Sequence, residues 1–172
     1  GDEDESRHEI PALRRDGRVN DGINGAELDA IDKAIVRALQ DDGRLPFAQL
    51  SPIVGLSEAA TRQRVNRLID RGVMSIVAVT DPARLGLPFQ AMLGVNVNGD
   101  VKVVADQLAA MNDVRYTVIV TGRYDILAEV VCLDAERLLD LVNDRIRPIP
   151  GVSSVETMTY LRLVSQSYDW GT

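Results

Sequence analysis

Cysteine and histidine are nearly absent from this sequence of 172 residues, which has one of each. The single cysteine, Cys132, excludes an internal disulfide framework. The single histidine, His8, leaves too few ligands for a zinc or iron site. We therefore expect neither a metal nor a cofactor.

Long apolar runs are missing as well. No run approaches the roughly 18 to 20 residues that cross a bilayer, and no apolar segment near the amino terminus resembles an export signal. We expect a cytoplasmic protein that does not bind membranes.

The sequence also has no recognisable catalytic arrangement. Cys132 lies in an apolar stretch without a structured histidine to act as its base. Acidic residues are numerous but scattered, and no pair is suited to acid–base catalysis. These absences argue against an enzyme.

The net charge of -7 is unevenly distributed. Residues 28–85 carry eight basic and seven acidic groups, whereas the segments on either side are acidic. Four arginines fall within 57–72, and a local basic surface can bind phosphate because salt screens charges beyond about 8 Å. The acidic total therefore does not exclude nucleic acid as a partner.

Residues 1–27 are polar and acidic, with apolar residues too sparse to show a period. Such a segment buries too little surface to offset its ordering entropy, so we expect a flexible acidic tail. His8 falls within it. The rest of the chain divides into 28–80, a linker at 81–88 and a second domain at 89–172.

Residues 28–80 predict a winged helix-turn-helix. Asp29 is a good N-cap for a first amphipathic helix, a second helix follows over 46–54, and Ser57 caps a third that ends near Arg71. Pro52 is unfavourable inside the second helix, which we expect to be bent or frayed near Ser51. The alternating residues 73–80 predict a strand, the wing.

The third helix has a polar face opposite its apolar one. Its small residues permit entry into a DNA major groove, Gln63 has the paired donor and acceptor that suit adenine, and Arg67 suits guanine or phosphate. The alternative interpretation is a solvated amphipathic helix. The candidate DNA-binding residues are Ser57, Ala59, Ala60, Arg62, Gln63, Arg64, Asn66 and Arg67.

Residues 89–172 predict a ferredoxin-like α+β domain. Strands over 89–97, 114–121, 126–133 and 152–165 alternate with helices that begin at Asp100 and Asp134, in the order βαββαβ. Both helices should cover one face of the sheet. The other face should hold Met92, Ile119, Leu127, Val131 and Met158, which is too apolar for water and predicts an isologous contact with a second copy.

The segment TGRYD, 121–125, joins the second and third strands. Gly122 lets a ligand approach the backbone, and Asp125 can hold an ammonium group, so the loop suits a free amino acid. A glycine and an aspartate in a hairpin are also ordinary turn residues. Both interpretations stay open on these residues alone.

Four stretches of the chain together resemble the Lrp/AsnC, or feast/famine, family of transcriptional regulators. They are LDAIDKAIVRALQDDGR, VGLSEAATRQRVNRLIDRGVM, TGRYD and IPGVSSVETMTYLRL, and the resemblance runs over 28–167. The resemblance implies a winged helix-turn-helix followed by a RAM domain, which binds effectors and mediates oligomerisation. It also implies a homodimer that assembles to an octamer and binds double-stranded DNA and a small effector, usually an amino acid.

The resemblance also implies which residues bind the effector. The glycine-rich effector loop of the family corresponds to Gly122, Tyr124 and Asp125, and the hydroxyls of its last strand to Thr157 and Thr159. The sequence departs from the family at Pro52 and in the length of its acidic tail. Pro52 and the acidic total motivate an alternative, an amino-acid-binding oligomer whose helix-turn-helix does not read DNA.

Overall fold

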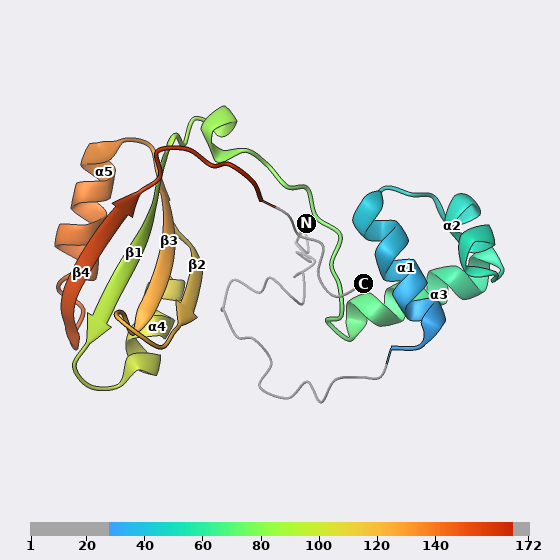
Figure 1. The fold of residues 1–172 in the computed structure, drawn as a ribbon, viewed down its shortest axis with the longest axis horizontal. Coiled ribbons are helices and arrows are strands. Elements are labelled where there is room, and N and C mark those ends of the chain that lie inside the picture. Colours follow the sequence, from blue (N-terminus) through green and yellow to red (C-terminus); the bar gives the residue numbers. More distant parts are fainter. Residues whose placement is uncertain (1–27, 167–172) are drawn as a thin grey trace, which may run out of the picture. The chain divides into compact units, whose positions relative to one another are not determined.

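The computed structural model describes residues 28–166, which fall into two compact units, 28–78 and 79–165. The predicted acidic tail at 1–27, with His8, lies outside the described residues. Figure 1 labels the helices and strands of both units. None of the helices within 28–166 has the length and apolar character needed to cross a membrane.

The amino-terminal unit consists of three helices, α1 (Ala30–Asp41), α2 (Phe47–Val54) and α3 (Glu58–Asp70). Asp29 caps α1 and Ser57 caps α3, as predicted: the Ser57 hydroxyl accepts a hydrogen bond from the Ala60 N–H at 3.2 Å. The helices bury a small apolar core of Ile35, Val36, Leu50, Val54, Val65 and Leu68. This confirms a helix-turn-helix.

Helix α2 continues through Pro52, so of the predicted bend or fraying near Ser51 the fraying is wrong, and the bend stays a prediction. Proline removes one helical hydrogen bond, but Leu50 and Val54 on either side of it are buried and hold the helix in place. Gly55 then ends α2 in the left-handed conformation, with φ 70°, which a glycine adopts without strain.

The wing strand predicted at 73–80 is not formed. A strand needs a hydrogen-bonded neighbour, and the described residues of this unit offer no second extended segment. The alternating apolar pattern leaves Ile76, Val77 and Val79 exposed instead. The predicted linker, 81–88, contains a single 3-10 turn, η1 (Pro82–Leu85), capped by Asp81.

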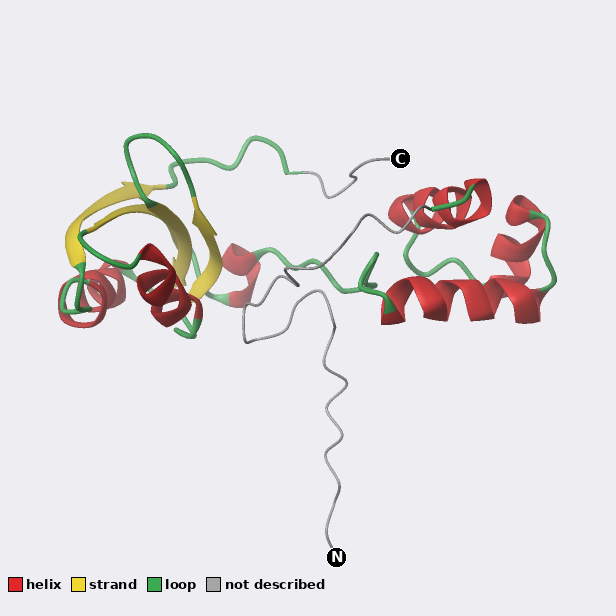
Figure 2. Cartoon of the chain, turned by 90° about the horizontal axis from the view of Figure 1, so that it is seen from below, coloured by secondary structure: helices red, strands yellow, loops and turns green. Residues whose placement is uncertain are grey.

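The carboxy-terminal unit is the predicted ferredoxin-like fold. Its strands are β1 (Phe89–Val97), β2 (Val114–Ile119), β3 (Ile126–Cys132) and β4 (Val152–Thr159), in the antiparallel order β2-β3-β1-β4. Its helices are α4 (Val101–Ala109), α5 (Ala135–Asp140) and the π-helical η2 (Leu141–Ile146). Figure 2 shows the helices on one face of the curved sheet.

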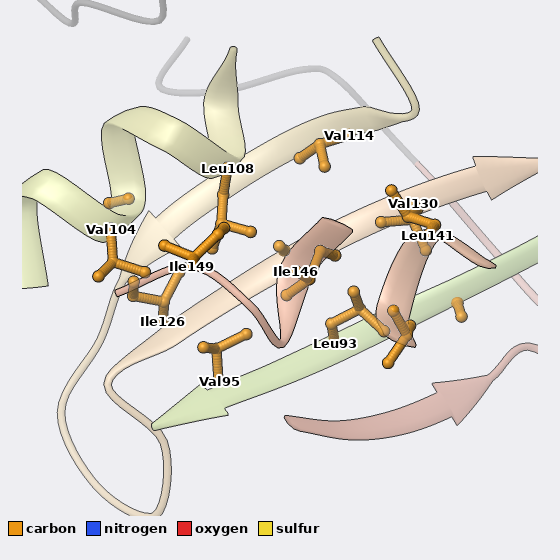
Figure 3. Close-up of a cluster of buried hydrophobic side chains, with 14 of the residues drawn as sticks. Leu93, Val95, Val104, Leu108, Val114, Ile126, Val130, Leu141, Ile146 and Ile149 are labelled. Atoms are coloured by element: carbon orange, nitrogen blue, oxygen red, sulfur yellow. The ribbon is translucent and has the colours of Figure 1, made fainter. Parts of the chain in front are cut away.

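The domain core lies between these helices and the sheet. Figure 3 shows Leu93 and Val95 of β1 on the same side of the sheet as Leu108, Leu141 and Ile146 of the helices. All five side chains are almost fully buried. The alternation of β1 therefore assigns its odd-numbered residues to the helix-covered face.

The sheet face opposite the helices carries apolar side chains, as predicted, but Ile119 was wrongly assigned to it. Met92 pairs with Met158, and Leu127 lies opposite Gly94, so these side chains point away from the helices. Ile119 lies opposite Ile126, a core residue, and so belongs to the helix-covered face. The bulge between Val114 and Tyr116 shifts the alternation that the sequence suggested.

Strand β4 ends at Thr159, six residues before the predicted end at 165. The last residue pair between β1 and β4 is Ala91–Thr159. Residues 161–166, among them Leu161 and Val164, are exposed.

Truncating Leu93 to alanine tests the assigned core. Leu93 is fully buried, so Leu93→Ala should lower the free energy of unfolding by about 2 to 5 kcal/mol. Leu139→Ala is the matched control; Leu139 is 63% exposed, and its loss should cost under about 0.5 kcal/mol. Urea denaturation followed by circular dichroism measures both. Equal effects would contradict the assigned core.

Candidate DNA-binding helix and effector loop

Helix α3 presents the predicted polar face to solvent. Thr61, Val65 and Leu68 are buried against the other helices. Of the eight candidate DNA-binding residues, Ser57, Ala59, Arg62, Gln63, Asn66 and Arg67 are exposed, and Ala60 and Arg64 are half-buried. Six of the eight candidate side chains are thus exposed to solvent.

Arg62 contacts α2 through a cation–π interaction. Its guanidinium carbon lies 4.8 Å from the centroid of the Phe47 ring, at the start of α2. The contact holds Arg62 beside the first turn of α2 while its charge stays exposed. The sequence analysis did not foresee this pair.

Arg64 has a different position from the other arginines of α3. Its guanidinium donates to Asp29, and at 2.9 Å to Asp32, so it joins two carboxylates at the start of α1. Arg67 approaches the same Asp32 carboxylate at 3.6 Å. Hydrogen bonding to Arg64 lowers the pKa of Asp29, and Asp29 in turn raises the pKa of Arg64.

In the carboxy-terminal unit, backbone hydrogen bonds hold the predicted effector loop against β1. The Val120 N–H donates to the Asp125 carbonyl at 2.9 Å, and the Asp125 N–H donates to the Val95 carbonyl at 3.0 Å. The Val97 N–H donates to Asp125 Oδ2 at 2.8 Å. One oxygen of the Asp125 carboxylate thus has a structural role, and Gly122, with φ 114°, makes the turn.

Tyr124 packs flat against a glycine of β1. A Cβ atom at Gly94 would lie 2.6 Å from the Tyr124 ring, so only glycine fits there. Arg123 pairs with Glu156 of β4 at 2.9 Å and lies 5.4 Å from the Tyr124 ring centroid. A hydrogen bond to Glu156 raises the pKa of Tyr124.

These contacts place a Tyr124, Arg123 and Glu156 cluster on the sheet face opposite the helices, because Glu156 lies opposite Gly94. A role for Gly94, Arg123 and Glu156 was not predicted from the sequence. An isolated glycine in an alternating strand was the available signal for a close approach.

Thr157 and Thr159 lie on the other face of the sheet. Thr157 pairs with Leu93 and Thr159 with Ala91, both core residues, so the two hydroxyls share the helix side of the edge strand. Within one chain the structure does not bring them together with Tyr124. Adjacent residues of a strand point to opposite faces, and Glu156 and Thr157 are adjacent.

A second tyrosine on the face opposite the helices is also paired with a glutamate. Tyr160 follows β4, and its N–H donates to the Gln90 carbonyl at 2.9 Å. Burial, together with a hydrogen bond to Glu129, raises the pKa of Tyr160 to about 12.

Two family models match the chain, one in each unit. An AsnC-type helix-turn-helix domain matches residues 28–69, and an Lrp/AsnC ligand binding domain matches residues 90–170. An uncharacterized HTH-type transcriptional regulator of Pyrococcus horikoshii is 36% identical over 133 residues, which cover 76% of this chain and 84% of that protein.

Solved structures show the same fold. The leucine response regulatory protein LrpA of Mycobacterium tuberculosis has a TM-score of 0.75 at 28% identity, covering 83% of this chain and 98% of its own. A transcriptional regulator of Neisseria meningitidis in complex with L-Met has a TM-score of 0.73 at 26% identity, covering 82% and 94%.

Removing the Glu129 carboxylate tests the tyrosine–glutamate pair. Glu129→Gln should lower the pKa of Tyr160 from about 12 toward 10, without reaching it, because the burial remains. Because the folded-state pKa of Tyr160 is raised, this residue contributes stability that is fully present below about pH 10 and is lost as the pH rises to about 12. In Glu129→Gln the loss of this stability should be complete at a lower pH.

Tyrosinate absorbance measures this titration, and Tyr160→Phe identifies the signal among the four tyrosines. A Glu129→Gln titration that matches the wild type would contradict the pairing.

Proposed function

The chain belongs to the Lrp/AsnC family of DNA-binding transcriptional regulators, and from this premise we propose that α3 reads a DNA duplex while the carboxy-terminal domain senses an amino acid. We assign 28–80 to the DNA-binding domain, 81–88 to a linker and 89–172 to the effector-binding domain. The observation that carries the proposal is the exposed polar face of a capped α3.

The proposed DNA contacts follow from the chemistry of that face. Ala59 and Ala60 leave room for close approach to the groove, and Gln63 and Asn66 offer the donor and acceptor pair that adenine matches. Arg62 and Arg67 supply positive charge for phosphates or guanine, and Ser57 sits at the positive end of the helix. Arg62 is pre-positioned by Phe47.

The proposed effector is a free amino acid. Asp125 has a second carboxylate oxygen available to an ammonium group beside the glycine turn at Gly122, and Arg123 and Tyr124 supply a cation and a hydroxyl. The structure of the Neisseria relative contains L-Met, which supports this ligand class. We therefore propose Gly122, Tyr124 and Asp125 as effector residues, with Thr157 and Thr159 contributed from another copy.

The involvement of a second copy follows from the two faces of the sheet. Thr157 and Thr159 lie on the opposite side from Tyr124 in one chain, so a site that uses all of them needs two chains. The face around Met92, Leu127 and Met158, whose side chains are half-buried, has no helix packed on it among the described residues and suits an isologous homodimer. We propose this dimer, its assembly to an octamer, and cytoplasmic action on DNA.

In this proposal the effector changes the assembly and therefore the spacing of the DNA-binding domains. An effector can shift assembly only if it binds the alternative assemblies with different affinity. The alternative hypothesis, a module that does not read DNA, was motivated by Pro52 and by the acidic total. Helix α2 is continuous through Pro52, which removes the first of these two grounds.

Replacing Arg67 tests the DNA interface. Arg67→Ala should weaken binding to all duplexes and lower the slope of log affinity against log salt concentration by about one, because one phosphate contact is lost. Arg37→Ala, an exposed arginine of α1, is the control and should leave the slope unchanged. Fluorescence anisotropy at several salt concentrations measures both, and an unchanged Arg67→Ala slope would remove Arg67 from the interface.

Replacing Asp125 tests the effector loop. Asp125→Asn keeps an acceptor for the Val97 N–H but removes the charge, so amino-acid affinity should fall at least about tenfold while DNA binding without effector is retained. Calorimetry with an amino acid found by thermal-shift screening measures this. Asp100→Asn, which keeps the cap of α4, is the control, and normal binding by Asp125→Asn would refute the assignment.

A further inference from the structure

Arg64 is held between two carboxylates, although its helix is the one that reads DNA. Its guanidinium bonds Asp29 and Asp32, which lie 35 and 32 residues earlier in the chain. Its side chain is 26% exposed, against 49% for that of Arg67 on the same helix. Arg64 is thus half-buried between helices.

The Asp32 carboxylate requires a cationic partner. Its side chain is only 4% exposed, and a buried charge without a partner is strongly destabilising. Asp32 also accepts from the Asp29 N–H at 3.3 Å, while Asp29 accepts from the Asp32 N–H at 2.7 Å, which forms a capping box. Arg64 therefore closes a cluster that begins α1.

We propose that Arg64 is a positioning residue that fixes the rotation of α3 against α1, and that it does not contact DNA. Apart from the longer approach of Arg67 to Asp32 at 3.6 Å, these helices pack through apolar side chains, and apolar packing is weakly directional. A guanidinium that bonds two fixed carboxylates is strongly directional. This inference rests on the proposed role of α3 in reading DNA.

A positioning role for Arg64 and simple electrostatics predict opposite effects of removing the Asp29 charge. Removing an acidic charge near a DNA-binding surface ordinarily strengthens binding, because it reduces repulsion of phosphate. Removing the Asp29 charge should instead weaken binding, because Arg64 loses a partner and α3 its fixed rotation. Gln63 and Arg67 share the helix, so their presentation to DNA changes with it.

Asp29→Asn is the informative variant, because asparagine caps a helix as well as aspartate does and the start of α1 is kept. The probe is a duplex that the wild-type full chain selects from a random-sequence pool. We expect Asp29→Asn to bind it about three- to tenfold more weakly, with an unchanged salt slope. Asp41→Asn, the same charge change at the other end of α1, should bind equally well or more tightly.

Arg64→Gln provides the second test. It should weaken binding with no change in the salt slope, whereas a residue that contacts phosphate would lower the slope by about one. Thermal unfolding monitored by circular dichroism identifies variants that are folded at the assay temperature, and binding is compared among those.

Different results would contradict the proposed role of Arg64 and the proposed reading of DNA by α3. Equal or tighter binding by folded Asp29→Asn, or a salt slope lowered by about one in Arg64→Gln, overturns the positioning role. A wild-type chain that selects no duplex would instead refute the proposed reading of DNA by α3. Weaker binding by both variants with unchanged slopes supports the inference.

Discussion

Within residues 28–166, which the structure describes, helices pack on only one face of the four-stranded sheet, and this constraint governs the carboxy-terminal domain. The helices pack on the face that holds Leu93 and Val95, and they leave Met92 and Met158 on the other. Two features follow from it in our proposals. The uncovered face is where a second copy would pack, and an effector site that uses residues of both faces is completed by another chain.

In the amino-terminal domain, a few charged residues help to fix how the helices pack. Its core is small, so apolar burial alone gives little control over the angle of α3. The carboxylates of Asp29 and Asp32 serve as helix caps, and both also bond Arg64. The same two side chains thus cap α1 and bond Arg64 of α3, while the polar face of α3 that we propose to contact DNA stays exposed.

Local sequence patterns predicted the helices and strands well, but they predicted the contacts between these elements less well. The caps at Asp29, Ser57, Asp100 and Asp134 and the order of strands could be read from the sequence because caps and alternation are local. The prediction of a strand at 73–80 was wrong because an alternating pattern does not supply a partner strand. Ile119 was placed on the wrong face because a bulge shifted the register by a residue.

The sequence by itself determined the two-domain order and the residues of the α3 face, because these depend on short-range periodicity, and its motifs carried the resemblance to the family. Only the tertiary structure decided that Arg64 bonds Asp29 and Asp32, that Tyr124 packs on Gly94, and that Thr157 lies across the sheet from both. Each of those facts joins residues about 30 or more positions apart. Strand register and helix packing set such distances, and neither is encoded in any short segment.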